Sequence, residues 1–401
     1  MALPPLSPAQ LAKPRRFELR VSLIFAALFI PQGVHLPYFP LWLESKGLDA
    51  EHIAIVLSAP MFLRVFTTPL ITALADRAKD RASVLVAMVA MSLILSIGYF
   101  FTSSFTAILI VSLLLSIVWT PHSTLADSLA LSGVRRFGSN YAHMRIWGSA
   151  AFLAANFFGG VAISLATESS VPAMISAGLV GTLAACLLAP RLGKPRRASP
   201  LSASAMQKAD PSLFTPYFLL CVVGAGLINS SHGFMYGFAS IYWKSIGIDG
   251  GVVGLLWTAS VVAEVGIFMA FTRVFGRTPS SILLGLAGLG AIVRWVAYPL
   301  VWPSGAGVAG FFAVQGLHAV STGLILLGVQ KLIAETIDED KMGAAQGVAF
   351  FASGLFMALV TLASGAVYEN MGANGFYVMA AVALVGVALI ACAGRQPQSA
   401  G

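Results

Sequence analysis

The stretch LWLESKGLDAEHIAIVLSAPMFLRVF at residues 41–66 has a second version, IYWKSIGIDGGVVGLLWTASVVAEVG, at residues 241–266. The two stretches align without a gap when the chain is shifted along itself by 200 residues. The matched positions include Gly47 with Gly247, Asp49 with Asp249, Ala59 with Ala259, Arg64 with Glu264 and, further along, Arg77 with Arg277. A repeat at such a long spacing predicts two halves of similar structure.

The composition is that of a membrane protein. The 401 residues are 58% hydrophobic and 10% charged, whereas soluble domains carry about 25% charged residues. A membrane-spanning helix needs ~20 mostly apolar residues. Twelve stretches meet this requirement, near residues 17–43, 52–75, 83–102, 105–131, 143–166, 171–190, 214–243, 251–273, 280–300, 306–333, 343–367 and 373–393. The sequence therefore predicts an all-α membrane protein without a soluble domain.

Twelve spans and one repeat together predict two six-helix halves in pseudo-twofold repeat. We expect an N-terminal bundle at residues 1–190 and a C-terminal bundle at residues 214–401, joined by a polar cytoplasmic linker at 191–213. Parallel six-helix repeats are the arrangement of major facilitator transporters, in which the substrate binds near the bilayer midplane and access alternates between the two sides. The pattern favours a transporter with this fold.

Lys and Arg residues cluster in alternate connections between the spans, whereas only Lys46 and Lys244 lie in the opposite set of loops. Cytoplasmic loops carry the excess of basic residues in membrane proteins, so both termini are expected in the cytoplasm. This distribution accounts for the net charge of +8. We therefore expect the lipid bilayer, and no nucleic acid, as a partner.

The cysteines and histidines give no sign of a catalytic or metal site. Cys186, Cys221 and Cys392 have no CxxC spacing and no accompanying histidine cluster, so neither a disulfide nor a metal is expected. Histidine and serine residues are scattered without nucleophile-elbow or metal-ligand spacing. The sequence predicts a protein that is not an enzyme, with no catalytic residue and no cofactor.

Asp127 and Arg145 stand within otherwise apolar sequence, in WTPHSTLADSLALSGVRRFGSNYAHMRIWGSAAF at residues 119–152. If the chain turns at residues 135–138, a symmetric helical hairpin sets the two side chains level. A charge at the bilayer centre costs about 2.5–3.5 kcal/mol even on lenient scales, so such residues usually face a partner or a watery cavity. Two interpretations stay open: a substrate-binding site, and an ion pair that only ties two helices together.

The loop LADRAKDR at residues 74–81 resembles the acidic-basic signature that major facilitator proteins carry between their second and third helices. Asp76, Arg77 and Arg81 are the matching charged residues and are expected to form a cytoplasmic gate, held by charge-assisted hydrogen bonds that break when the halves rock. Thr72 and Lys79 stand where the family prefers glycine. An ordinary solvated loop is the alternative.

Four further stretches carry a closer resemblance: GVHLPYFPLWLESKGL (33–48), YAHMRIWGSAAF (141–152), YGFASIYWKSIG (236–247) and SVVAEVGIF (260–268). Over the whole chain the sequence is similar to the phenylpropionate permease family of proton symporters, relatives of lactose permease. The resemblance implies a bacterial inner-membrane transporter that uses the proton gradient as its energy source. A monomer that binds a small molecule and protons is expected.

The lactose permease branch implies roles for particular residues. Asp127 and Arg145 occupy positions that grip substrate there, Glu264 matches an acid used in binding and coupling, and Arg294 and His318 match a ninth-helix arginine and a tenth-helix histidine. One turn beyond that histidine lactose permease has a proton-exchanging carboxylate, whereas this chain has Ser321 and Thr322. The proton must therefore be carried elsewhere. Glu264 is the best candidate, because burial favours a neutral carboxyl group, and His318 is the second.

The membrane charges suggest the sign of the substrate. Arg64, Arg145 and Arg294 outnumber Asp127 and Glu264 by one when His318 is neutral. An unpaired buried arginine is costly, and a ligand carboxylate could pair with its guanidinium fork. Arg294 is the predicted carboxylate site, because Arg145 has Asp127 as a partner; the role of Arg64 stays open.

The leading interpretation is symport of a small organic anion such as an aromatic monocarboxylate. Trp147 and Tyr236 are among the aromatic residues that could contact its ring. The alternative is proton symport of a neutral sugar or nucleoside. An efflux antiporter is less favoured, because the fifth span lacks the Gly-Pro pattern usual in such proteins.

Overall fold

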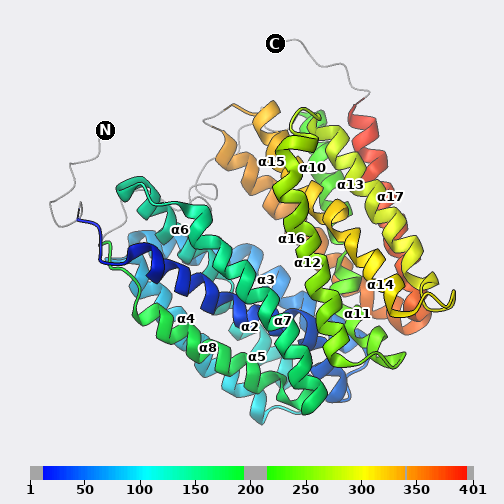
Figure 1. Ribbon diagram of the computed structural model, residues 1–401, viewed down its shortest axis with the longest axis horizontal. Coiled ribbons are helices and arrows are strands. Elements are labelled where there is room, and N and C mark those ends of the chain that lie inside the picture. The colour runs from blue at the N-terminus through cyan, green and yellow to red at the C-terminus, as the bar shows by residue number, and fades with distance from the viewer. Residues whose placement is uncertain (1–11, 194–214, 339–340, 395–401) are drawn as a thin grey trace. The chain divides into compact units, whose positions relative to one another are not determined.

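The computed structural model describes residues 12–193, 215–338 and 341–394, and these residues form helices and no strand (Figure 1). In this part of the chain, eleven stretches are long and apolar enough to cross a membrane. The last of them, Met342–Ala393, has 52 residues and contains two separate helices, which correspond to the predicted eleventh and twelfth spans. The predicted all-α membrane fold is confirmed.

Contacts divide the described residues into two compact units. Among the described residues, unit 1 takes those up to Trp42 and those from Leu63 to residue 193, and unit 2 takes Leu43–Phe62 and those from residue 215 onward. The end of the first span and the start of the second therefore cluster with unit 2. The division at residues 1–190 and 214–401 stays a prediction, and residues 194–213 of the expected linker lie outside the described residues.

The first six spans are built from seven α-helices. Their bounds are α2 Phe17–Ser45, α3 Ala50–Arg77, α4 Arg81–Ile97, α5 Phe105–Trp119, α6 Pro121–Phe137, α7 Tyr141–Leu165 and α8 Val171–Leu187. Helices α5 and α6 adjoin at Thr120 and form one span of 33 residues. Proline at the start of α6 explains the junction, because proline lacks the N–H that a continuous helix needs.

The remaining spans contain two further interruptions. Their helices are α10 Pro216–Ser230, α11 Gly233–Ser245, α12 Gly250–Phe275, α13 Ser280–Ala297, α14 Gly307–Gly316, the π-helix η5 Ala319–Gly323, α15 Leu324–Thr336, α16 Met342–Met371 and α17 Gly375–Ala393. Ser231 and His232 separate α10 from α11, and η5 separates α14 from α15.

The sequence repeat is visible at the turns that precede α3 and α12. Gly47 and Gly247 adopt left-handed backbone conformations, with φ of +80° and +85°, which glycine tolerates best. Asp49 and Asp249 then cap the following helices, each accepting a backbone N–H at 2.8 Å from His52 and Gly251. The hydrogen bond from the His52 backbone also lowers the pKa of the Asp49 carboxyl group. The two copies of the motif therefore fold alike.

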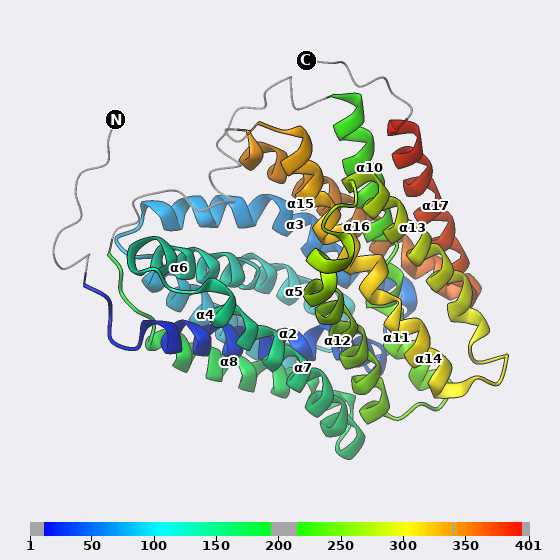
Figure 2. The same cartoon turned by 45° about the horizontal axis from the view of Figure 1, so that its top comes forward.

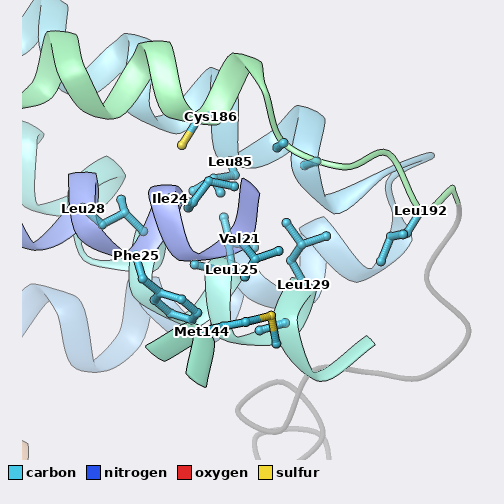
Figure 3. Close-up of a cluster of buried hydrophobic side chains, with 14 of the residues drawn as sticks. Val21, Ile24, Phe25, Leu28, Leu85, Leu125, Leu129, Met144, Cys186 and Leu192 are labelled. Carbon is cyan, nitrogen blue, oxygen red and sulfur yellow. The ribbon is translucent and has the colours of Figure 1, made fainter. Parts of the chain in front are cut away.

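Unit 1 has an apolar core drawn from helices that are distant in sequence. Figure 3 shows Ile24 of α2, Leu85 of α4, Leu125 of α6 and Met144 of α7 among the clustered side chains. Lipid tails are as apolar as leucine, so close packing holds such helices together.

In unit 2, the backbones of α10 and α17 are in close contact. Figures 1 and 2 show α13 and α17 side by side with α10 adjoining them. A Cβ atom at Gly224 would lie 2.7 Å from the carbonyl oxygen of Gly386, and one at Gly386 would lie 2.6 Å from that of Gly224. Glycine is required at both positions, since neither backbone can yield without moving a helix.

We predict that Gly224→Ala lowers the free energy of unfolding by about 1–3 kcal/mol, the usual cost of overpacking. The matched control is Gly285→Ala in α13, where a Cβ atom would meet nothing within 4 Å. Alanine should leave the stability at that position unchanged or raise it, because it favours helix. Thermal unfolding in detergent measures both variants, and equal melting temperatures would contradict the packing argument.

Candidate functional site

The two helix interruptions of unit 2 are joined by hydrogen bonds. His232, in the break between α10 and α11, has its Nε2 atom 3.0 Å from Ser321 Oγ and 3.2 Å from Thr322 Oγ1, both in η5. Trp295 of α13 donates its ring N–H to Ser231 Oγ at 2.8 Å. Discontinuous spans and π-helical turns are frequent at binding sites in transporters. The arrangement marks this region as the candidate site.

Arg294 of α13 lies at the centre of this region and is fully buried. Its Nε atom donates to the carbonyl oxygen of Val314 at 3.2 Å, and Nη1 contacts His318 Nδ1 at 2.8 Å. Its Nη2 atom donates to Gln315 Oε1 at 2.5 Å and to Met235 Sδ at 3.0 Å. None of these partners is acidic. Within the described residues, the guanidinium charge has hydrogen bonds but no ion pair.

His318 connects Arg294 to Glu264. A guanidinium only donates hydrogen bonds, so the Nδ1 atom of His318 must accept, and the neutral ring carries its hydrogen on Nε2. That nitrogen lies 3.7 Å from Glu264 Oε2 in α12. Glu264 keeps 19% of its side chain exposed, whereas the His318 side chain is 6% exposed. The carboxyl group of Glu264 is therefore the accessible end of a buried row of three side chains, Arg294, His318 and Glu264.

Tyr236 of α11 lies beside this row of side chains. Its ring stacks on Trp257 with centroids 6.1 Å apart, and Trp257 is held by a hydrogen bond to Ser240 at 2.9 Å. Its ring centroid also lies 6.2 Å from that of His232. Among the described residues the Tyr236 hydroxyl makes no hydrogen bond, which leaves it available to a ligand.

His232 and Gln315 belong to the site but were not predicted to act there. Both are fully buried. Gln315 also donates to the carbonyl oxygen of Leu256 at 3.1 Å, which joins α14 to α12. The run of Asn229, Ser230, Ser231 and His232 within an apolar span was the available signal. Four polar residues in succession at membrane depth indicate that a helix is interrupted.

Asp127 and Arg145 lie on the two arms of the predicted helical hairpin in unit 1. Gly138 ends α6 in a left-handed conformation with φ of +67°, and α7 begins three residues later. The hydrogen bond to Asp127 comes from the Tyr141 hydroxyl at 2.8 Å. No direct ion pair with Arg145 forms among the described residues. The guanidinium instead lies 4.1 Å from the centre of the Phe29 ring, and its buried Nη1 atom has no hydrogen-bond partner.

Trp147 and Arg64 are not part of a hydrogen-bonded site within unit 1. Trp147 is 57% exposed on α7. Arg64 of α3 is partly buried, and no hydrogen bond or ion pair joins it to another described residue. The substrate-binding role of Trp147 stays a prediction, and the role of Arg64 stays open.

The loop between α3 and α4 is held by an ion pair. Arg81 donates through Nε and Nη2 to Asp76 Oδ1 at 2.8 and 2.5 Å, and through Nη1 to Ser132 Oγ of α6 at 3.4 Å. Thr72, which replaces a family glycine, is buried and donates to the carbonyl oxygen of Thr68. Arg77 is exposed. The Asp76–Arg81 ion pair fixes the loop within unit 1. The role of Asp76, Arg77 and Arg81 as a cytoplasmic gate stays a prediction.

Comparison with known proteins identifies the family. The model of the MFS_1 like family matches residues 19–379. The chain belongs to the MFS_1-like family of major facilitator transporters. It is 26% identical over 370 residues to a probable 3-phenylpropionic acid transporter of Escherichia coli (strain K12), covering 91% of this chain and 94% of that protein. The predicted resemblance to the phenylpropionate permease family is confirmed.

Other similarities establish the fold more broadly. A maltose permease of Geobacillus stearothermophilus is 26% identical over 289 residues, 70% of this chain and 71% of that protein. The structure of the nucleoside transporter NupG superposes with a TM-score of 0.77 at 15% identity, covering 95% of this chain and 100% of that one. This protein is therefore an integral membrane transporter with the major facilitator fold, and not an enzyme.

Proposed function

We propose that this protein is a secondary active transporter that couples proton entry to symport of a small organic anion, with an aromatic monocarboxylate as the preferred substrate. Access alternates between the two sides of the membrane, and no cofactor takes part. The observation that carries the proposal is the buried guanidinium of Arg294, which has no acidic hydrogen-bond partner and is linked through His318 to Glu264.

Charge balance explains how a proton would control anion binding. With Glu264 ionised, its negative charge offsets Arg294 across the His318 ring. When Glu264 takes up a proton, the charge of Arg294 loses this compensation, and an isolated buried cation is unfavourable by several kcal/mol. A substrate carboxylate then restores neutrality and can accept two hydrogen bonds from the guanidinium fork. Proton and anion thus favour each other's binding, which is the linkage that symport requires.

Arg294 is inaccessible in this structure, so binding must include a local rearrangement. Its Nη1 and Nη2 atoms are covered by His318 and Gln315. We infer that a ligand displaces one of these side chains. Tyr236, partly exposed and stacked on Trp257, is positioned to contact the ring of an aromatic acid. In unit 1, the proposal assigns substrate binding to Asp127, Arg145 and Trp147. It assigns the cytoplasmic gate to Asp76, Arg77 and Arg81.

Two comparisons support different substrates. The relative in Escherichia coli is named for 3-phenylpropionic acid, which is an aromatic monocarboxylate. The maltose permease relative favours the second candidate, proton symport of a neutral sugar. The charge of Arg294 supports the anion, because a neutral sugar would leave this charge uncompensated when Glu264 is protonated.

We also propose that the protein lies in a bacterial inner membrane as a monomer, with both termini in the cytoplasm. Lys46 follows α2 and Lys244 lies in the last turn of α11, at the ends of spans opposite the basic connections. Lys46→Cys and Lys244→Cys should therefore react with an impermeant thiol reagent on intact cells. Lys79→Cys should react only after the cells are broken. The reverse labelling pattern would overturn this orientation.

The proposal is tested by uptake of labelled 3-phenylpropionate into cells or proteoliposomes, with and without a protonophore. Wild-type protein should accumulate the acid only when a proton gradient is present. Glu264→Gln should abolish accumulation while retaining exchange of substrate, because the exchangeable proton is lost but the neutral form is mimicked. Glu369→Gln, at an exposed position of α16, is the matched control and should behave as wild type.

Two results would contradict the proposal in different ways. Accumulation by Glu264→Gln at the wild-type level would remove Glu264 from coupling. Robust proton-driven sugar or nucleoside uptake, without uptake of any aromatic acid, would replace the anion by the neutral substrate.

A further inference from the structure

Two imidazole rings and two hydroxyl groups form one cluster between the α10–α11 break and η5. Thr322 Oγ1 lies between the rings, 3.2 Å from His232 Nε2 and 3.3 Å from His318 Nδ1. Ser321 Oγ lies 3.0 Å from His232 Nε2 and can also donate to the His318 carbonyl oxygen at 3.4 Å. The ring centroids of the two histidines are 5.7 Å apart. Each hydroxyl has a single hydrogen to donate, and for Thr322 the direction of that hydrogen depends on both rings.

The hydrogen on His232 can be assigned from its neighbours. Its Nδ1 atom faces the carbonyl oxygens of Ile228 and Asn229 at 3.3 and 3.1 Å. Carbonyl oxygens only accept hydrogen bonds, so Nδ1 carries the hydrogen and Nε2 offers a lone pair. Ser321 and Thr322 can both donate to that lone pair. Ser321 has the His318 carbonyl oxygen as a second acceptor, whereas the Thr322 hydroxyl has only the two imidazole rings among the described residues. All of these groups are satisfied when Ser321 donates to the carbonyl oxygen and Thr322 donates to His232 Nε2.

His318 Nδ1 has one lone pair and two possible donors. Arg294 Nη1 lies at 2.8 Å and Thr322 Oγ1 at 3.3 Å. The charged and closer donor makes the stronger hydrogen bond. The Thr322 hydroxyl therefore donates its hydrogen to His232 Nε2, and it does so only while that nitrogen is an acceptor.

We propose that His232 is a positioning residue of the coupling site, which holds the Thr322 hydroxyl and thereby reserves His318 Nδ1 for Arg294. Without this acceptor, Thr322 turns its hydrogen to His318 and competes with the guanidinium. Arg294 is then held less firmly, and its availability to an anion depends less on the proton at Glu264. The consequence for transport rests on the proposed function, whereas the hydrogen-bond arrangement does not.

The arrangement is tested without any substrate by ¹⁵N NMR of the histidine side chains in detergent. The chain has six histidines, and the His318 signals are assigned by their absence in His318→Asn. His232→Leu should shift the Nδ1 resonance of His318, because Thr322 becomes a second donor. Thr322→Val alone should not shift it, and adding Thr322→Val to His232→Leu should restore the wild-type value. His232→Gln, whose side-chain oxygen can replace Nε2 as an acceptor, should leave the resonance in place.

A purely structural role for His232 gives a different result. If His232→Leu only disturbed the packing, the His318 shift would persist in the His232→Leu/Thr322→Val double variant. That outcome, or no shift in His232→Leu, would overturn the proposal. His122→Leu in unit 1 is the matched control, since His122 is also fully buried with its Nε2 atom 3.2 Å from a serine hydroxyl, that of Ser92.

Transport provides the second measurement. In His232→Leu, the change of KM for the aromatic acid between mildly acidic and mildly alkaline medium should shrink at least about twofold, and the double variant should recover it. An unchanged KM profile in His232→Leu would contradict the proposed effect on Arg294. If wild-type protein bound no aromatic acid, the proposed function would fail, while the NMR result would still decide the role of His232.

Discussion

A guanidinium charge buried without an acidic partner is the constraint on which the candidate site depends. Arg294 is fully buried, and its hydrogen-bond acceptors come from α11, from α14 and from His318 at the start of η5. A cation in this environment tolerates few arrangements, because losing one acceptor leaves a buried charged donor unsatisfied. The tautomer of His318 and the position of Gln315 both follow from this one side chain.

The repeat supplies the scaffold, and only one copy carries this chemistry. Positions 94 and 118 correspond to Arg294 and His318 under the 200-residue shift, and they hold isoleucine and valine. Position 64 corresponds to Glu264 and holds arginine instead of an acid. The repeated turns at Gly47 and Gly247 are nevertheless alike in conformation. The two copies of the repeat therefore share the helical framework, whereas the charged site is present only in the second copy.

Hydropathy and the repeat were sufficient to predict the spans, because each span is long and apolar. Averaged over a span, they do not reveal the break at His232, whose only signal is the short polar run at residues 229–232. They also do not reveal the π-helical turn at residues 319–323, since a local change in helix winding leaves the average hydropathy unaltered. Arg294, His318 and Glu264 were selected through the resemblance to the lactose permease branch, which these polar residues in apolar spans carry. Gln315 and Tyr141 were not, because their importance comes from partners distant in sequence that only the folded chain brings close.

The most direct measurement of the central claim is binding of 3-phenylpropionate to purified Gln315→Glu by calorimetry. Gln315 Oε1 lies 2.5 Å from Arg294 Nη2, so the new carboxylate would supply a counter-charge that remains when Glu264 is protonated. We predict binding at least about tenfold weaker than wild type, equivalent to ~1.4 kcal/mol. Gln315→Met, without a charge, and Gln346→Glu, at an exposed position, should not weaken it. Equal affinity of Gln315→Glu and wild type would contradict the claim that the uncompensated charge of Arg294 attracts the substrate.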